Sequence, residues 1–229
     1  MPDTKLNWAN LREHLRKNLL IYIVVVAVAL VLTNLLWMTT APRVPEEAQV
    51  LIYLAGPYSN PTALDAVAAD MLTRGQEYDG TLQAVEFQSL LYADPEQDYT
   101  GVMLLMTRLA TGEGDAFLAD INAMQALENS GALLGLDDYY AAGWMADSGL
   151  EPYYSTWEDE ETGQSVTQLT GFRIDSLDFL RDSEAFENRG AFLTVAANST
   201  NVETTMRALS IMVEDLKKAV PTTNSDLQK

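Results

Sequence analysis

The sequence predicts an α/β protein with one N-terminal transmembrane helix followed by a single parallel or mixed sheet with flanking helices. Two observations lead to this fold class. Residues 19–38 form an apolar run with almost no interruption. After residue 48, short apolar and β-branched segments alternate with segments whose apolar residues recur at helical spacing, a pattern typical of right-handed βαβ units. The 229 residues allow one domain plus an anchor, or at most two small domains.

The apolar run begins at Leu19 and is long enough to cross a bilayer. At about 1.5 Å of rise per residue, a helix from Leu19 to Met38 spans the hydrocarbon core of roughly 30 Å. Arg16 and Lys17 precede it, so the positive-inside rule places the N-terminus in the cytoplasm. We therefore expect a single-pass cell-membrane protein with a cytoplasmic stub at 1–17, a transmembrane helix at 18–39 and an extracytoplasmic main domain.

A cleaved signal peptide is the competing interpretation of this run. The apolar core of a signal peptide is about 7–15 residues long and ends at a small-residue cleavage site. The run here is longer, and Pro42 directly follows the small residues Thr40 and Ala41. A proline just after the scissile bond should hinder a peptidase. The sequence therefore favours a retained anchor.

The remaining elements follow in order along the chain. Residues 40–47 contain two prolines and form a predicted linker, residues 48–220 form the predicted α/β domain, and residues 221–229 form a predicted disordered tail. Asn60-Pro61 is a helix-start signal, and Pro221 ends the last helix. Strands are expected at 49–54, 82–87, 115–119, 153–157, 165–169 and 191–196, and helices at 61–75, 99–109, 121–128 and 202–219.

The charge is strongly uneven. Of 14 basic and 33 acidic residues, residues 1–42 hold four basic and two acidic ones, which leaves the rest of the chain at about −21. A domain this acidic repels phosphate backbones, so nucleic acid is not an expected partner. The acidity either keeps an exposed domain soluble or attracts cations and basic partners.

Several kinds of catalytic chemistry are missing from the predicted outer domain. The chain has no Cys, and its one histidine, His14, precedes the apolar run. This excludes Ser-His-Asp and Cys-His nucleophilic sites and His-ligated zinc there, and no phosphate-binding glycine motif is present. Acidic pairs at Asp137-Asp138 and within 158–161 are typical of solvated turns rather than of catalytic acids or a calcium site. We expect no enzyme activity, no cofactor and no metal.

Residues 109–140, LATGEGDAFLADINAMQALENSGALLGLDDYY, carry a resemblance to a known family. The turn Thr111-Gly112-Glu113, the strand that starts at Asp115, and Leu136-Asp137-Asp138-Tyr139 resemble a stretch of the extracellular solute-binding proteins of ABC importers, the type 2 periplasmic-binding-protein-like family. The segment AFLTVAANSTNVETTMRALSIMVEDL is similar to the last strand and helix of that family. Only about 50 residues separate Tyr140 from Ala191, too few for a second lobe of on the order of 100 residues. The resemblance therefore implies roughly one lobe.

This fold implies where a ligand would bind. In open α/β sheets, ligands lie beyond the carboxyl ends of the strands. At that edge we expect candidate ligand-binding residues after the first, third and last strands, with ordinary loop and cap chemistry as the alternative. They are Tyr58, Ser59, Asn60, Asp120, Asn122, Asn198 and Ser199.

Two functions remain open from the sequence. The first is a membrane-anchored domain resembling a solute-binding lobe, which takes a small molecule or peptide and serves as the binding or accessory subunit of a membrane transport complex. The second is a structural scaffold that binds no ligand and docks on another membrane protein. In both, the partners are the bilayer and a membrane protein such as a transporter permease.

Overall fold

The computed structural model describes residues 13–14, 16–40, 44–92, 99–158 and 164–218. The expected tail at 221–229, most of the stub at 1–17, residues 41–43 of the linker and positions 159–161 of the acidic turn lie outside the described residues. The chain divides into two compact units, Met1–Arg43 and Val44–Lys229.

The first unit consists mainly of one apolar helix, α2 (Leu19–Thr40). Its 22 residues give a length of about 33 Å at 1.5 Å per residue. No part of the window Leu19–Trp37 is buried within the fold, and the window is long and apolar enough to cross a membrane. The expectation of an N-terminal apolar helix is confirmed. A helix that exposes apolar side chains on every side is unfavourable in water, which makes it compatible with a membrane anchor.

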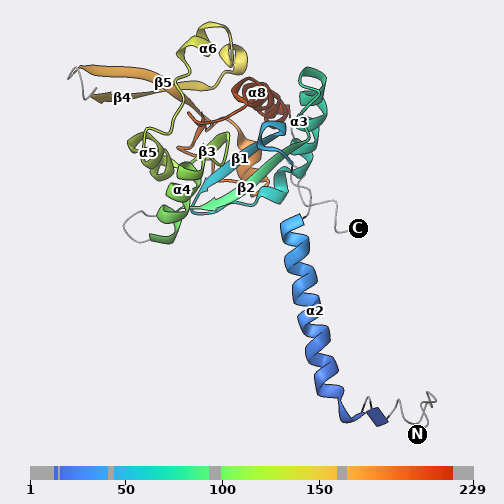
Figure 1. The fold of residues 1–229 in the computed structure, drawn as a ribbon. Coiled ribbons are helices and arrows are strands. Elements are labelled where there is room, and N and C mark those ends of the chain that lie inside the picture. The colour runs from blue at the N-terminus through green and yellow to red at the C-terminus, as the bar shows by residue number, and fades with distance from the viewer. Residues whose placement is uncertain (1–12, 15, 41–43, 93–98, 159–163, 219–229) are drawn as a thin grey trace. The chain divides into compact units, whose positions relative to one another are not determined.

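The second unit is built on a six-stranded mixed sheet (Figure 1), and its α/β class is confirmed. The first three strands along the chain, in the order β2-β1-β3, are parallel, as the βαβ pattern predicts. Beyond β3, each neighbour is antiparallel. The strands, in sheet order, are β2 (Ala84–Leu91), β1 (Gln49–Gly56), β3 (Ala116–Ala119), β6 (Phe192–Val195), β5 (Ser165–Arg173) and β4 (Glu151–Glu158).

Helices cover both faces of this sheet, and the alternation along β1 shows how. Val50, Ile52 and Leu54 pack in one core with α3 (Asp65–Tyr78) and α8 (Val202–Lys218). Leu51 and Tyr53 pack in a second core with α4 (Tyr99–Thr111) and α5 (Ile121–Asn129). Because successive side chains of a strand point to opposite faces, an almost wholly apolar strand such as β1 has to be covered on both sides.

Short helical elements complete the domain. Among its α-helices, two were not expected from the sequence. They are α6 (Asp137–Ala141) and α7 (Asp178–Asp182), each only five residues long. A helix of five residues makes little more than one turn, so its apolar residues do not repeat at helical spacing in the sequence. The 3₁₀ turns are η1 (Glu46–Ala48), η2 (Pro61–Leu64) and η3 (Ala146–Ser148). The hairpin of β4 and β5 projects from the rest of the domain (Figure 1).

Candidate functional site

A cavity lies at the carboxyl edge of the sheet, where β1, β3 and β5 end and β6 begins. Its volume is ≈ 420 Å³, which falls within the range of small-molecule sites. Tyr58 follows β1, Asp120 follows β3, and Arg173 is the last residue of β5. The full lining is Pro57, Tyr58, Asp120, Ile121, Arg173, Phe186, Glu187, Arg189, Gly190 and Phe192. A smaller cavity of ≈ 280 Å³ shares Tyr58, Phe186 and Glu187 with it and adds Arg181 and Glu184.

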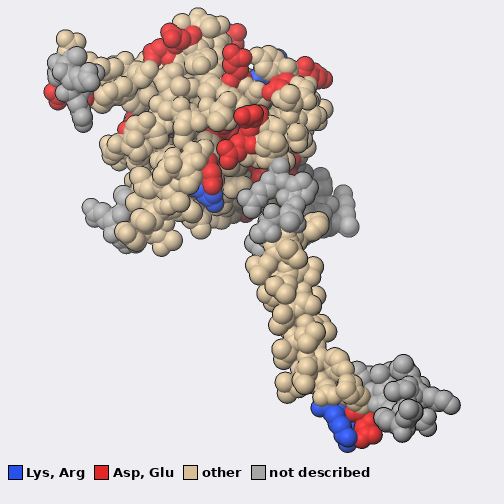
Figure 2. Space-filling model, in the orientation of Figure 1, with Lys and Arg blue, Asp and Glu red and all other residues tan. Residues whose placement is uncertain are grey.

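Two arginines give this cavity its cationic groups. The Arg173 guanidinium lies 5.7 Å from the centroid of the Phe192 ring and 3.1 Å from Asp175 Oδ2. Arg189 is exposed at the rim, and among the residues that the structure describes it has no acidic partner within ion-pair distance. The domain has few basic residues, and the face in Figure 2 shows many more acidic than basic side chains. An unpaired guanidinium at a cavity is therefore available for an anionic group.

The loop that carries Arg189 is fixed to the end of β5. Asn188 is fully buried, and its side-chain Nδ2 donates to the carbonyls of Ile174 and Asp175 at 3.1 and 3.0 Å. The backbone N–H of Gly190 donates to Asp175 Oδ1 at 2.7 Å. Burial raises the pKa of Asp175, but this hydrogen bond and the Arg173 guanidinium outweigh it, so the pKa is lowered. An ionised Asp175 therefore holds both the loop and Arg173.

Asp120 supplies a carboxylate to the same cavity. It is the N-cap of α5, and its side chain accepts a hydrogen bond from the backbone N–H of Ala123 at 2.8 Å. Burial raises the pKa of Asp120, and hydrogen bonds from the N–H groups of Ala123 and Asn122 partly oppose this. The cavity lining thus combines two carboxylates, Asp120 and Glu187, with the guanidinium groups of Arg173 and Arg189. That arrangement suits a ligand that carries both an anionic and a cationic group.

Three of the expected site residues lie near this edge but are held by the scaffold. Ser59 Oγ lies 2.5 Å from Ser89 Oγ at the end of β2. Asn60 donates from its backbone N–H to the Ala185 carbonyl at 2.8 Å and accepts from Thr62 Oγ1 at 2.6 Å. Asn122 lies in the first turn of α5, where its backbone N–H supports Asp120. Of the seven expected residues, only Tyr58 and Asp120 line the cavity.

The expected placement of Asn198 and Ser199 at the carboxyl edge is wrong. Because β6 is antiparallel to β3, its end lies at the opposite edge of the sheet, where β1 and β3 begin. There Ser199 Oγ donates to Asp115 Oδ1 at 2.7 Å, and Asn198 Nδ2 donates to the Leu109 carbonyl at 3.3 Å. Asp115 is buried, which raises its pKa, and it also accepts from the Leu51 N–H at 2.9 Å. This cluster joins the strands to the start of α8.

Sequence reasoning missed Arg173, Arg189, Phe186 and Phe192. They come from β5, β6 and the loop between them, a part of the chain with no recognisable motif. One usable signal was the rarity of basic residues: the chain from residue 43 onward has only 10 of them. An arginine retained beside a strand end in such an acidic domain is a candidate for anion contact.

No protein-family model and no curated protein matches this chain. Across the described parts of the chain, no group of three or more His, Cys, Asp or Glu residues is placed to hold a metal ion.

Proposed function

We propose that this chain is a single-pass membrane protein whose α/β domain lies outside the cytoplasm and binds a small zwitterionic or anionic solute. In this proposal the domain is the binding or accessory subunit of a membrane transport complex, as the resemblance to a solute-binding lobe implies. The function is binding rather than catalysis, and it needs no cofactor.

One observation carries the proposal: the carboxyl-edge cavity combines an unpaired guanidinium and a second arginine with two carboxylates, Asp120 and Glu187. Arg189 and Arg173 face an anionic group of the ligand, and Asp120 faces an ammonium group. Tyr58, which is 52% exposed, offers a ring for contact with the ligand body. A site at the carboxyl ends of strands is also where open α/β sheets take their ligands.

A thermal-shift panel on the full chain in neutral-lipid nanodiscs tests this function. The panel contains amino acids, dipeptides and dicarboxylates, with sugars as neutral comparators. Because a ligand that binds only the folded state raises Tm, we expect a concentration-dependent rise with at least one charged class and none with sugars. Arg189→Gln should abolish the shift, whereas Arg207→Gln, which removes an exposed arginine from α8, should not. No shift with any charged compound contradicts the proposal.

A specific observation favours the alternative function of a scaffold that docks on a membrane protein. Tyr99, Met103 and Met106 stand at i, i+4 and i+7 on α4, and all three are exposed. Leu91 and Leu104 are exposed as well. An apolar stripe at helical spacing normally faces a core, so an exposed one favours contact with another apolar surface.

Crosslinking separates the two functions. A photo-crosslinker at Met103 should capture a stoichiometric membrane protein if the stripe is a docking face, and a crosslinker at exposed Glu77 on α3 is the matched control. Capture at both positions or at neither contradicts the scaffold function, and it leaves the thermal-shift test of the cavity unaffected.

A further inference from the structure

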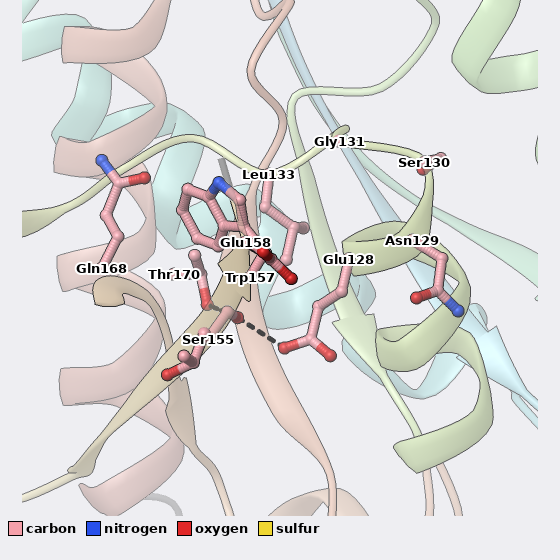
Figure 3. Close-up of a pocket in the computed structure, with 11 residues that line it drawn as sticks. Glu128, Asn129, Ser130, Gly131, Leu133, Ser155, Trp157, Glu158, Gln168 and Thr170 are labelled. Carbon is pink, nitrogen blue, oxygen red and sulfur yellow. Dashed lines mark hydrogen bonds between the residues drawn. The ribbon is translucent and has the colours of Figure 1, made fainter. Parts of the chain in front are cut away.

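A second cavity lies between the projecting hairpin and the end of α5, on residues that the carboxyl-edge site does not use (Figure 3). Its volume is ≈ 660 Å³. One wall is the last turn of α5 and the segment after it, and the other is the facing surface of β4 and β5. We name it the hairpin groove. Its lining is Glu128, Asn129, Ser130, Gly131, Leu133, Ser155, Thr156, Trp157, Glu158, Gln168 and Thr170.

The floor of the hairpin groove is an ordered polar network. Ser155 Oγ donates to Glu128 Oε1 at 2.5 Å and lies 2.5 Å from Thr170 Oγ1. Ser155 and Thr170 are buried, at 6% and 2% exposure, whereas Glu128 is half-buried. Figure 3 shows the Glu128 side chain reaching from α5 toward the hairpin. The hydrogen bond from Ser155 therefore holds one carboxylate oxygen of Glu128 at the groove wall.

The charged side chains that line the groove are all acidic. None of its eleven described lining residues is basic, and two of them, Glu128 and Glu158, are acidic. The helix α5 also ends here, and the carbonyl end of a helix carries partial negative charge. Glu128 also acts on Tyr153 of β4. Burial is the main cause that raises the pKa of Tyr153, the charge and a hydrogen bond of Glu128 raise it further, and Arg173 partly opposes them.

Trp157 adds an aromatic surface to this negative groove. It lies near the end of β4 and is 43% exposed, although a tryptophan is normally well buried. An exposed indole beside carboxylates attracts ammonium and guanidinium groups through its π face, and the same ring covers the apolar body of such a ligand. The amide of Gln168, which also lines the groove, provides a further hydrogen-bonding position.

We propose that the hairpin groove binds an organic cation, with Glu128 as the counter-ion and Trp157 as the stacking surface. The ligand is a guanidinium or ammonium group on a larger body, and it is either a free small molecule or an arginine or lysine side chain of a peptide. This second site is independent of the carboxyl-edge cavity, whose proposed ligands need an anionic group.

The test is calorimetric titration of the full chain in neutral-lipid nanodiscs, with empty nanodiscs as the blank. The probes are agmatine, for the free cation, and the uncharged-ended peptide acetyl-Gly-Arg-Gly-amide, for the peptide source. We expect at least one to bind with Kd below about 1 mM, and binding to weaken as salt rises. Tighter binding of agmatine would indicate a free small-molecule ligand, and tighter binding of the peptide would indicate a peptide ligand. Failure of both probes to bind overturns the proposal.

Two variants with matched controls assign the binding to the groove. Glu128→Gln should weaken it by about 10-fold or more, while the Gln oxygen still accepts from Ser155 and preserves the fold. Trp157→Leu should weaken it by about 3- to 10-fold. Glu77→Gln removes the same charge elsewhere, and Tyr154→Leu removes an exposed aromatic from the same strand, so both should bind as the wild type does. If the controls lose as much affinity as the groove variants, the cation is held by net charge alone and the proposal is wrong.

Discussion

Asp215 on α8 stands in a cluster where three carboxylates share one arginine. Arg74 Nη1 lies 3.0 Å from Asp215 and 3.3 Å from Asp70, and Arg74 Nη2 lies 2.5 Å from Glu214. Burial is the main cause that raises the pKa of Asp215 to about 6. The protonated form also donates a hydrogen bond to Asp70 and avoids repulsion from the Asp70 charge. Glu214 behaves oppositely, because Lys218 and Arg74 lower its pKa to about 2. Within the described residues, Asp215 Oδ2 is buried with no hydrogen-bond partner.

The raised pKa of Asp215 predicts the direction and the magnitude of the change in the free energy of unfolding caused by Asp215→Asn. A shift from 3.8 to about 6 corresponds to about 3 kcal/mol at 1.36 kcal/mol per unit. Between about pH 4 and pH 6, Asp215 is protonated in the folded state but ionised in the unfolded state. The free energy of unfolding therefore falls as pH rises through this range, and the full destabilisation by ionised Asp215 is present at pH 7. Asparagine removes the charge and places an N–H donor toward Asp70. The pKa of about 6 already includes the attraction of Arg74, and solvent screens part of the interaction at this site, so we expect a net gain of about 1–2 kcal/mol at pH 7.

Urea unfolding of the full chain in nanodiscs, followed by tryptophan fluorescence, measures this gain. Trp144 is a suitable reporter because its Nε1 donates to the Met206 carbonyl on α8. The gain should be full at pH 7.5 and fall by roughly half at pH 5, where the folded state of the wild type is already protonated at Asp215. Asp147→Asn, which removes an exposed carboxylate within η3, should show no such pH dependence. A gain that is equal at both pH values, or a loss at pH 7.5, would refute the reasoning.

Three further predictions concern the fold and the site. Asp115→Ala should lower the free energy of unfolding by about 2–3 kcal/mol in urea, since the buried Leu51 N–H loses its acceptor; an unchanged midpoint contradicts this. Gly114→Ala should lower Tm more than Gly131→Ala in differential scanning fluorimetry. Both have positive φ, but only at Gly114 would a Cβ lie 2.7 Å from the Tyr53 ring, so equal losses contradict the packing argument. Arg189→Gln should leave Tm unchanged, because its guanidinium supports no described contact, and a large loss would mean a structural role.

Local patterns were sufficient to predict most of the elements. The run 49–54 predicts β1, and Asn60-Pro61 predicts the start of the helical segment that follows it. The stripe from Met206 to Leu216 predicts α8, and all its apolar residues are buried. These signals are local because burial of one face fixes the spacing of apolar residues along the chain. The five-residue helices α6 and α7 lack such spacing and depend on contacts distant in sequence.

Strand direction was the main feature that the sequence did not reveal. The pattern of alternating strands and helices indicates parallel pairing for β1, β2 and β3, where each crossover contains a helix. The 50 residues before β6 contain the hairpin of β4 and β5 instead of a single crossover helix. The four residues of β6 themselves carry no signal for whether the strand is parallel or antiparallel to β3. Its antiparallel direction moves Asn198 and Ser199 to the edge opposite Tyr58 and Asp120.

The candidate site was predicted in position but only partly in composition. The rule that ligands lie beyond strand carboxyl ends led to Tyr58 and Asp120, which line the cavity. Arg173 reaches the same edge because β5 runs parallel to β3 two strands away, and Arg189 because Asn188 fixes its loop there. The positions of both arginines depend on tertiary packing, which cannot be predicted from a short segment of the sequence.

Titration of the full chain in neutral-lipid nanodiscs with the best charged compound of the thermal-shift panel tests the carboxyl-edge site most directly. The wild type and Arg207→Gln should bind with equal affinity, and Arg189→Gln should bind about 10-fold or more weakly, because a guanidinium–carboxylate contact is lost. Equal binding by the wild type and both variants, or binding by none of them, would contradict the assignment of a charged solute to this cavity.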